Sequence, residues 1–209
     1  MTAVARLRAR TWNVVMGPDS SESDCTRGEV VLTLAIESTA LVVIDPWADH
    51  PNQGWYRRAA ANVPRLLRLI QLFRGHERPI FYDATGRPVH GSILEGAGPH
   101  DHFIEWDPMG GGTRVLDGML KERQVRTIFW AGYSANLCLM TKPCGFRQIM
   151  PTDWDRRHFL VRDATVAFES NDTLGSQALL DAACYEVEYY PNGYSTTVDD
   201  VAAMYEGVT

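Results

Sequence analysis

The stretch that decides the fold is TIFWAGYSANLCLMTKPCGFRQIM, residues 127–150. Its first part is apolar and rich in aromatic and β-branched residues as far as Gly132, which predicts a buried strand and a tight turn. The residues after the turn follow a helical pattern, and Cys138 stands where that helix should begin. The free N–H groups and the dipole of a helix N-terminus favour a thiolate and can bind an oxyanion. Cys138 is therefore a candidate nucleophile.

Most free cysteines are buried packing residues without reactivity, so the position of Cys138 alone does not establish catalysis. A reactive cysteine needs an accessible, electropositive site and a base. The rest of the chain has to supply that base.

Length and composition indicate one α/β domain. The chain has 209 residues, of which 45% are hydrophobic, and this is enough for a sizeable core. It contains no apolar run long enough to span a bilayer, and residues 1–10 lack the apolar region of a signal peptide. We therefore expect a soluble, cytoplasmic protein that does not bind membranes.

Charge and cysteine content limit the partners. The net charge of -6 and the pI near 5.5 argue against a nucleic-acid or anionic-membrane partner, which would require a basic face. We expect a small-molecule substrate and a homo-oligomer, a dimer or a tetramer. The cysteines have no CxxC spacing, so we expect reduced thiols at Cys25, Cys138, Cys144 and Cys184.

Residues 1–38 differ from the rest of the chain because they lack a helical period. A turn-like segment, GPDSSESD at 17–24, separates two strand-like pieces at 7–15 and 28–36. We interpret residues 1–38 as an N-terminal extension that forms a β-hairpin or arm on the domain or on a second subunit. The alternative is a partly disordered leader.

From residue 39 to residue 209 the pattern is that of a single α/β domain. Strands alternating with helices predict a doubly wound, mostly parallel six-stranded sheet with helices on both faces, a Rossmann-like arrangement. The expected strands are 40–45, 79–83, 102–106, 127–131, 158–162 and 185–189, and the expected helices are 55–75, 113–123, the segment after Cys138, 173–183 and 197–205. Residues 85–102 form a long loop in this interpretation.

The predicted topology brings a carboxylate to Cys138. In the common strand order 3-2-1-4-5-6, the first and fourth strands are neighbours at the switch point where ligands bind. Asp45 ends the first strand, ALVVID, and Cys138 follows the fourth. Asp45 is therefore a candidate base for the thiol proton.

The combination of ALVVID with AGYSANLCL resembles the isochorismatase-like superfamily of cysteine hydrolases, which includes nicotinamidases, N-carbamoylsarcosine amidase and biuret hydrolase. The resemblance covers roughly residues 39–190. It implies that Asp45 is the base and Cys138 the nucleophile. It also implies a cis peptide between Tyr133 and Ser134, and an oxyanion hole formed by backbone N–H groups near Ser134 and Cys138.

The third catalytic residue of this superfamily is a lysine at the end of the third strand, and this chain departs there. The position falls on or beside Glu105, and the only lysines are Lys121 and Lys142. Three interpretations are open. Glu105 is a functional replacement that shares a proton with Asp45 or joins it in holding a cationic substrate group. Alternatively, Lys142 supplies the positive charge from the Cys138 helix, or Glu105 is a solvated residue in an inactive protein.

Several other residues are weaker candidates. Asp83 matches a metal ligand of some relatives, but no histidine follows it closely, and we expect neither a metal nor a cofactor. The histidines of the long loop region are more typical of loop residues than of metal ligands. Aromatic residues near the crevice predict a pocket for a planar substrate. The loop histidines are His90, His100 and His102, and the aromatic residues are Trp47, Trp55, Trp106 and Tyr133.

These observations favour a cysteine hydrolase that cleaves a C–N bond of a small amide, urea-like or hydrazide compound through a thioester. Two alternatives stay open. One is a non-catalytic homologue that binds a ligand or acts as a scaffold. The other is an isochorismatase-type vinyl-ether hydrolase, which needs the acid but not the thiol.

Overall fold

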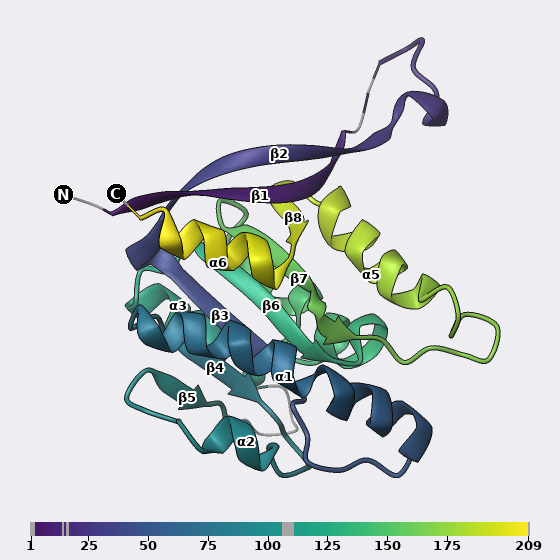
Figure 1. Ribbon diagram of the computed structural model, residues 1–209. Helices are drawn as coiled ribbons and strands as arrows, with labels where there is room; N and C mark the ends of the chain where they lie inside the picture. Colours follow the sequence, from purple (N-terminus) through teal and green to yellow (C-terminus); the bar gives the residue numbers. More distant parts are fainter. Residues whose placement is uncertain (1–2, 14, 16, 106–110, 209) are drawn as a thin grey trace.

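The computed structural model describes residues 3–13, 15, 17–105 and 111–208. One sheet of eight strands runs through the molecule in the order β2-β1-β8-β7-β6-β3-β4-β5 (Figure 1). The strands are β1 (Val4–Asn13), β2 (Thr26–Ala35), β3 (Thr39–Ile44), β4 (Ile80–Asp83), β5 (Asp101–Phe103), β6 (Thr127–Tyr133), β7 (Arg157–Val166) and β8 (Gly193–Thr196).

The six strands from β3 to β8 confirm the predicted parallel topology. Their order, β5-β4-β3-β6-β7-β8, is the expected 3-2-1-4-5-6 order, and every neighbouring pair among them is parallel. The predicted number of six strands is wrong, because β1 and β2 extend the sheet beyond β8. The central pair β3 and β6 is the switch point.

The last predicted strand, 185–189, is also wrong, because these residues end a helix, α5 (Ala178–Tyr189). The segment YEVEY alternates as a strand does, but its buried residues belong to a helical face with Ala183, Cys184, Val187 and Glu188. The sixth parallel strand is β8, a few residues later, where Gly193 follows the turn. A Cβ on Gly193 would lie 1.8 Å from the Val187 carbonyl oxygen, so this turn requires glycine.

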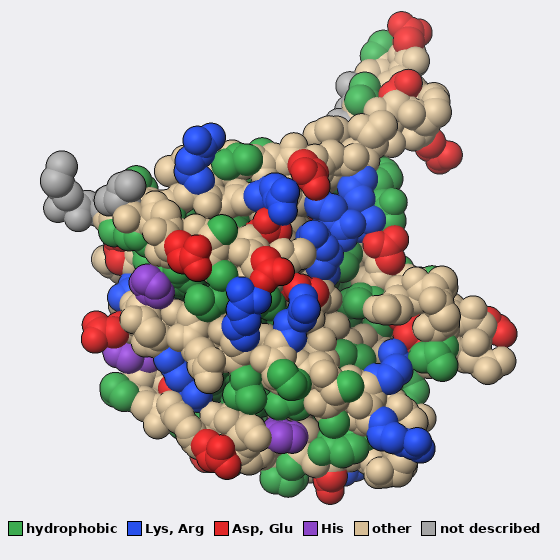
Figure 2. Space-filling model, in the orientation of Figure 1, with side chains coloured by type: hydrophobic (Ala, Val, Ile, Leu, Met, Phe, Trp, Pro, Cys, Tyr) green, Lys and Arg blue, Asp and Glu red, His purple; other side chains and the backbone are tan. Residues whose placement is uncertain are grey.

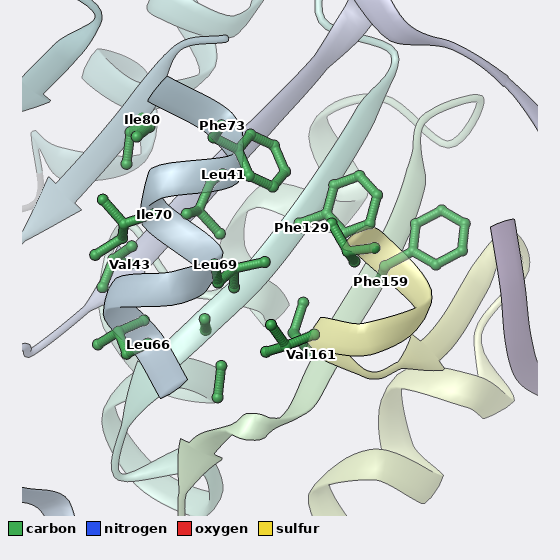
Figure 3. Packing of buried hydrophobic residues seen from close by; sticks show 14 of the residues in the cluster. Leu41, Val43, Leu66, Leu69, Ile70, Phe73, Ile80, Phe129, Phe159 and Val161 are labelled. Atoms are coloured by element: carbon green, nitrogen blue, oxygen red, sulfur yellow. The ribbon is translucent and has the colours of Figure 1, made fainter. Parts of the chain in front are cut away.

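Helices cover both faces of the sheet, and β3 shows how the sequence divides them. Alternate residues of a strand point to opposite faces. Leu41 and Val43 pack against α1 (Gln53–Gly75) and α6 (Val198–Glu206), whereas Val42 and Ile44 belong to the second core with α3 (Gly112–Glu122) and α5. In Figure 3, Leu66, Leu69, Ile70 and Phe73 of α1 lie over Leu41, Val43 and Phe129. Two short helices, α2 (Gly91–Leu94) and α4 (Phe146–Ile149), complete the described set.

The start of α1 follows from its capping residue. The Asn52 side chain accepts the backbone N–H of Trp55 at 3.0 Å, which satisfies one of the free donors of the first turn. Among the described residues, no helix combines the length and the apolarity that a membrane crossing requires.

The N-terminal segment forms the expected hairpin. β1 and β2 are antiparallel with Leu7 opposite Leu32, and the loop between them projects away from the body (Figure 1). Strand β1 joins the sheet through Arg10, which pairs with Ser195 of β8. Beneath this junction the buried Glu188 carboxylate accepts from Arg27 at 2.5 Å and from Ser195, and basic side chains gather here on the surface (Figure 2). The hairpin is therefore anchored by a buried charge.

Candidate active site

The site begins with the close approach of β3 and β6 at their carboxyl ends. Ile44 pairs with Gly132, and a Cβ on Gly132 would lie 2.1 Å from the Ile44 carbonyl oxygen. Gly132 also has φ +116°, which side chains rarely adopt. The glycine predicted to end the strand is therefore what lets Asp45 and the Cys138 segment meet.

Asp45 is fully buried at the end of β3 and lies beside both Cys138 and Lys142. Its Oδ1 accepts a hydrogen bond from Lys142 Nζ, its carboxylate hydrogen bonds with the Cys138 thiol, and its backbone N–H donates to the Asp83 carbonyl at 2.7 Å. Burial raises the pKa of Asp45 to about 6, Lys142 and Cys138 oppose the rise, and Asp83 adds to it. Asp45 is thus a carboxylate at neutral pH, with more basicity than an exposed aspartate.

Cys138 lies in a short π-helical turn, Ala135–Leu139, and is half-buried. Burial raises the pKa of its thiol to about 12, and the neighbouring Asp45 carboxylate raises it further than Lys142 and Ser134 lower it. The expectation of a resting thiolate is therefore wrong. A turn of five residues has a weak dipole, and the adjacent carboxylate outweighs it.

Ser134 departs from the expected backbone geometry. The described residues contain no cis peptide bond, so the peptide between Tyr133 and Ser134 is trans, contrary to the expectation. Ser134 instead turns the chain with a left-handed conformation, φ 57° and ψ 55°. Its side chain hydrogen bonds with Cys138. The oxyanion hole near Ser134 and Cys138 stays a prediction.

Lys142 is the cation of this site. Its Nζ contacts Asp45 Oδ1 and lies 3.4 Å from Asp83 Oδ1, and only 15% of its side chain is exposed. Burial alone would lower the pKa of Lys142, but Asp45 and Asp83 raise it above its ordinary value, so the amine is charged. This is the second of the three interpretations drawn from the sequence. The chain bends after Lys142 because Pro143 cannot continue the helix.

Glu105 forms none of the described side-chain hydrogen bonds or ion pairs of Asp45, and its catalytic role stays a prediction. Its side chain is exposed just after β5, and it lines a surface hollow of about 310 Å³ with Tyr82, Thr85 and Phe103. Lys142 and Asp83 are the charged residues among the largest causes of the Asp45 pKa shift. The signal that identifies Lys142 in the sequence is its position four residues after Cys138, on the same helical face.

Three of the four predicted aromatic residues form one cluster beside Lys142. Trp55 makes edge contacts with Trp47 and Tyr133 at centroid distances of 6.4 and 6.0 Å, and Lys142 Nζ lies 5.4 Å from the Trp47 ring centroid. The sequence interpretation missed His50 and Phe168, which also pack on Trp55. Trp106 lies outside the described residues.

Polar atoms of this cluster have no partner within the described part of the chain. They are Nε1 of Trp47, Nε1 of Trp55 and the hydroxyl of Tyr133, all of them buried. Such buried donors are rare unless a ligand or water satisfies them.

The candidate metal ligands do not assemble. The described residues contain no group of three or more His, Cys, Asp or Glu side chains arranged to hold a metal ion. Asp83 faces Lys142 instead, His102 stacks on Phe81, and the backbone carbonyl of His90 accepts at the start of α2.

Comparisons with known proteins support the fold. No protein-family model matches the chain, and no curated protein matches it by sequence. Among solved structures, a cysteine hydrolase from Pseudomonas syringae pv. phaseolicola 1448A is 17% identical with a TM-score of 0.64, and the match covers 83% of this chain and 94% of that one.

Two further solved structures agree with the first. N-carbamoylsarcosine amidase from Thermoplasma acidophilum is 19% identical with a TM-score of 0.53, covering 78% of this chain and 97% of that one. An isochorismatase family protein from Burkholderia thailandensis is 20% identical with a TM-score of 0.55, covering 81% and 96%. The chain therefore has the isochorismatase-like fold that its motifs predict.

Proposed function

We propose that this protein is a cysteine hydrolase that cleaves the C–N bond of a small amide, urea-like or hydrazide compound. The observation that carries the proposal is the contact of Asp45 with both the Cys138 thiol and Lys142 at the switch point of the sheet. The names of the similar structures, a cysteine hydrolase and an amidase, agree with it.

In this proposal the thiol is the resting form, and it loses its proton as it attacks. Asp45 accepts the proton while Cys138 Sγ bonds to the substrate carbonyl carbon, and backbone N–H groups near Ser134 and Cys138 bind the oxyanion. The protonated Asp45 then gives its proton to the leaving amine. Water, deprotonated by Asp45, hydrolyses the thioester and restores the thiol.

Lys142 keeps Asp45 ionised between these steps. The ammonium lowers the pKa of Asp45 and so opposes the effect of burial. Without this cation the carboxyl would hold its proton near neutral pH and would not be a base. Lys142 thus takes the role that the superfamily assigns to a strand lysine, but from the turn that carries Cys138.

The aromatic cluster supports a planar substrate. Trp47 is half-buried beside Lys142, and its Nε1 has no partner among the described residues. A compact conjugated amide or urea group would fit both features, because its faces stack on rings and its carbonyl accepts N–H groups.

A non-catalytic binding protein is the second candidate, and the raised pKa of the Cys138 thiol favours it. Vinyl-ether hydrolysis is a third, because a carboxyl with a pKa of about 6 can also donate a proton. The cytoplasmic location and the assembly into a dimer or tetramer remain predictions.

The test is a panel of small amides, ureas, hydrazides and vinyl ethers, analysed by mass spectrometry of products and of the intact protein. We expect amine release together with an acyl adduct on the Cys138 peptide, and loss of both in Cys138→Ala. Turnover that persists in Cys138→Ala would contradict the thioester mechanism. Binding without turnover would support the second candidate.

A further inference from the structure

Asp83 is a second buried carboxylate at the site, and the proposed reaction assigns it no step. It ends β4, the neighbour of β3 on the side away from β6, and it is fully buried with its Oδ1 3.4 Å from Lys142 Nζ. The same oxygen accepts from the Thr85 hydroxyl at 2.8 Å and from the Thr85 backbone N–H at 3.2 Å. These bonds fix the carboxylate in one orientation toward the ammonium.

Asp83 is also tied to the base through the backbone. Its carbonyl accepts the Asp45 N–H at 2.7 Å, just beyond the last paired residues of β3 and β4. Asp45 has φ 51° there, a conformation that costs energy for a residue other than glycine. One residue therefore holds the base by its backbone and the cation by its side chain.

The charges in this buried cluster do not balance. Asp45 and Asp83 contribute two negative charges, and Lys142 contributes one positive charge. Arg87 approaches the Trp47 ring, but it is paired with the exposed Asp49 at 3.2 Å and adds little net charge. By formal charge, the described residues of this cluster thus carry one more negative group than positive groups.

We infer that Asp83 is a positioning residue that holds Lys142 against Asp45, and that the surplus negative charge restricts the site to neutral or cationic substrates. The inference rests on the proposed function, because it names the substrate class of that same site. An anionic group brought to Cys138 is repelled in a weakly solvated environment, whereas a cationic group replaces the missing positive charge.

The charge preference can be measured without knowing the substrate. Three methanethiosulfonate reagents convert a thiol to a mixed disulfide with release of methanesulfinate: the cationic trimethylammonioethyl, the neutral methyl and the anionic sulfonatoethyl compounds. Rates at Cys138 are obtained by peptide mapping and divided by the rates with N-acetylcysteinamide. We expect the cationic reagent to be favoured over the anionic one by about tenfold or more at low ionic strength.

Variants separate charge from position. Asp83→Asn should remove most of the preference, whereas Asp83→Glu should keep the preference because it keeps the charge. Asp101→Asn is the matched control. Asp101 is a buried aspartate of the neighbouring strand β5 that pairs with Arg74, and its substitution should leave the preference unchanged. Equal normalised rates for the cationic and anionic reagents in the wild type would overturn the inferred preference for neutral or cationic substrates. This outcome does not depend on whether any variant folds.

The positioning role has its own measurement. Lys142 lowers the pKa of Asp45 more than Asp83 raises it, so Asp83→Asn, by releasing Lys142 from Asp45, should shift the acid limb of Cys138 alkylation by iodoacetamide to higher pH. A shift to lower pH would show that Lys142 stays in place without Asp83, and would also overturn the positioning role. A purely structural Asp83 would change the rate at every pH and leave the limb in place, which would overturn the positioning role. Neither result depends on hydrolysis, so failure of the amide panel would contradict the proposed function separately.

Discussion

Lys142 lies one helical turn after Cys138, and its backbone N–H donates to the Cys138 carbonyl oxygen at 3.0 Å. The same turn therefore carries the candidate nucleophile and the cation, and both side chains reach Asp45 on the neighbouring strand segment. Two of the three groups of the site thus depend on one local conformation.

Lys142→Met should abolish most of the thiol reactivity. Without the ammonium, Asp45 is protonated at neutral pH and cannot take the thiol proton, so we expect a loss of about 100-fold or more in Cys138 alkylation and in turnover. The measurement is the iodoacetamide rate at Cys138 across pH. Lys121→Met is the matched control, because Lys121 is exposed and paired with Asp117. Equal losses in both variants would contradict the role of Lys142.

The pH dependence of turnover should follow Asp45. Its pKa of about 6 predicts an acid limb near pH 6, because the base is lost when the carboxylate is protonated. Asp45→Asn should remove the limb together with turnover. Glu105→Gln should give a profile superimposable on that of the wild type, and a changed profile would return Glu105 to the site.

Ionisation of Asp45 should lower the free energy of unfolding as the pH rises. An ordinary ion-paired aspartate has the opposite effect. Burial raises the folded-state pKa above the unfolded value of 3.8, so the Asp45 contribution is fully present below pH 3.8 and is lost as the pH rises through about 6. We therefore compare the free energy of unfolding of Asp45→Asn with that of the wild type. The difference, variant minus wild type, should be larger at pH 7 than at pH 4. Urea unfolding of both proteins at the two pH values measures this, and a difference of the opposite sign would contradict it.

Among the charged residues of the hairpin junction, replacement of Glu188 should lower the free energy of unfolding the most. Glu188→Ala leaves Arg27 and Arg10 without their buried partner, and we expect a loss of about 3 kcal/mol or more in the free energy of unfolding. Glu186→Ala is the control, because Glu186 forms a surface pair with Arg147 and should cost less than about 1 kcal/mol. Urea unfolding followed by circular dichroism gives both values, and equal losses would refute the buried anchor.

Gly132→Ala should prevent folding or cost more than about 4 kcal/mol, because its Cβ overlaps the Ile44 backbone. Gly86→Ala provides the comparison. Gly86 also has positive φ, +92°, but nothing lies within 4 Å of its added Cβ, so only the conformational cost of about 1–2 kcal/mol remains. Thermal unfolding distinguishes them, and similar melting temperatures would contradict the close approach of β3 and β6.

The sequence predicts the central strands well because each of them is apolar along its whole length. TALVVI and TIFWAGY, the sequences of β3 and β6, are buried at every position, as parallel strands between two helix layers must be. The order of these strands, and hence the meeting of Asp45 with Cys138, follows from general rules of α/β topology. The last strand could not be placed, because YEVEY alternates while the helix it ends is only weakly amphipathic.

The details of the site depend on tertiary contacts that local patterns do not contain. The sequence places Cys138 at a helix start but does not show the burial and the carboxylate that raise its pKa. It also offers Glu105 and Lys142 as alternatives, because the distance from either residue to Asp45 depends on how β5 and the Cys138 turn pack. The resemblance also predicts a cis peptide before Ser134, whereas the structure has a trans peptide there.

The pairing of Arg10 with Ser195 has a consequence for how the protein is made. The two residues are 185 positions apart, so the N-terminal hairpin is synthesised long before the strand that receives it. At a translation rate of about 5–20 residues per second, the hairpin, complete at Ala35, waits roughly 10–30 seconds with its apolar face uncovered. The arginines of β1 are charged side chains of the kind that discourages pairing of an uncovered strand edge with other chains.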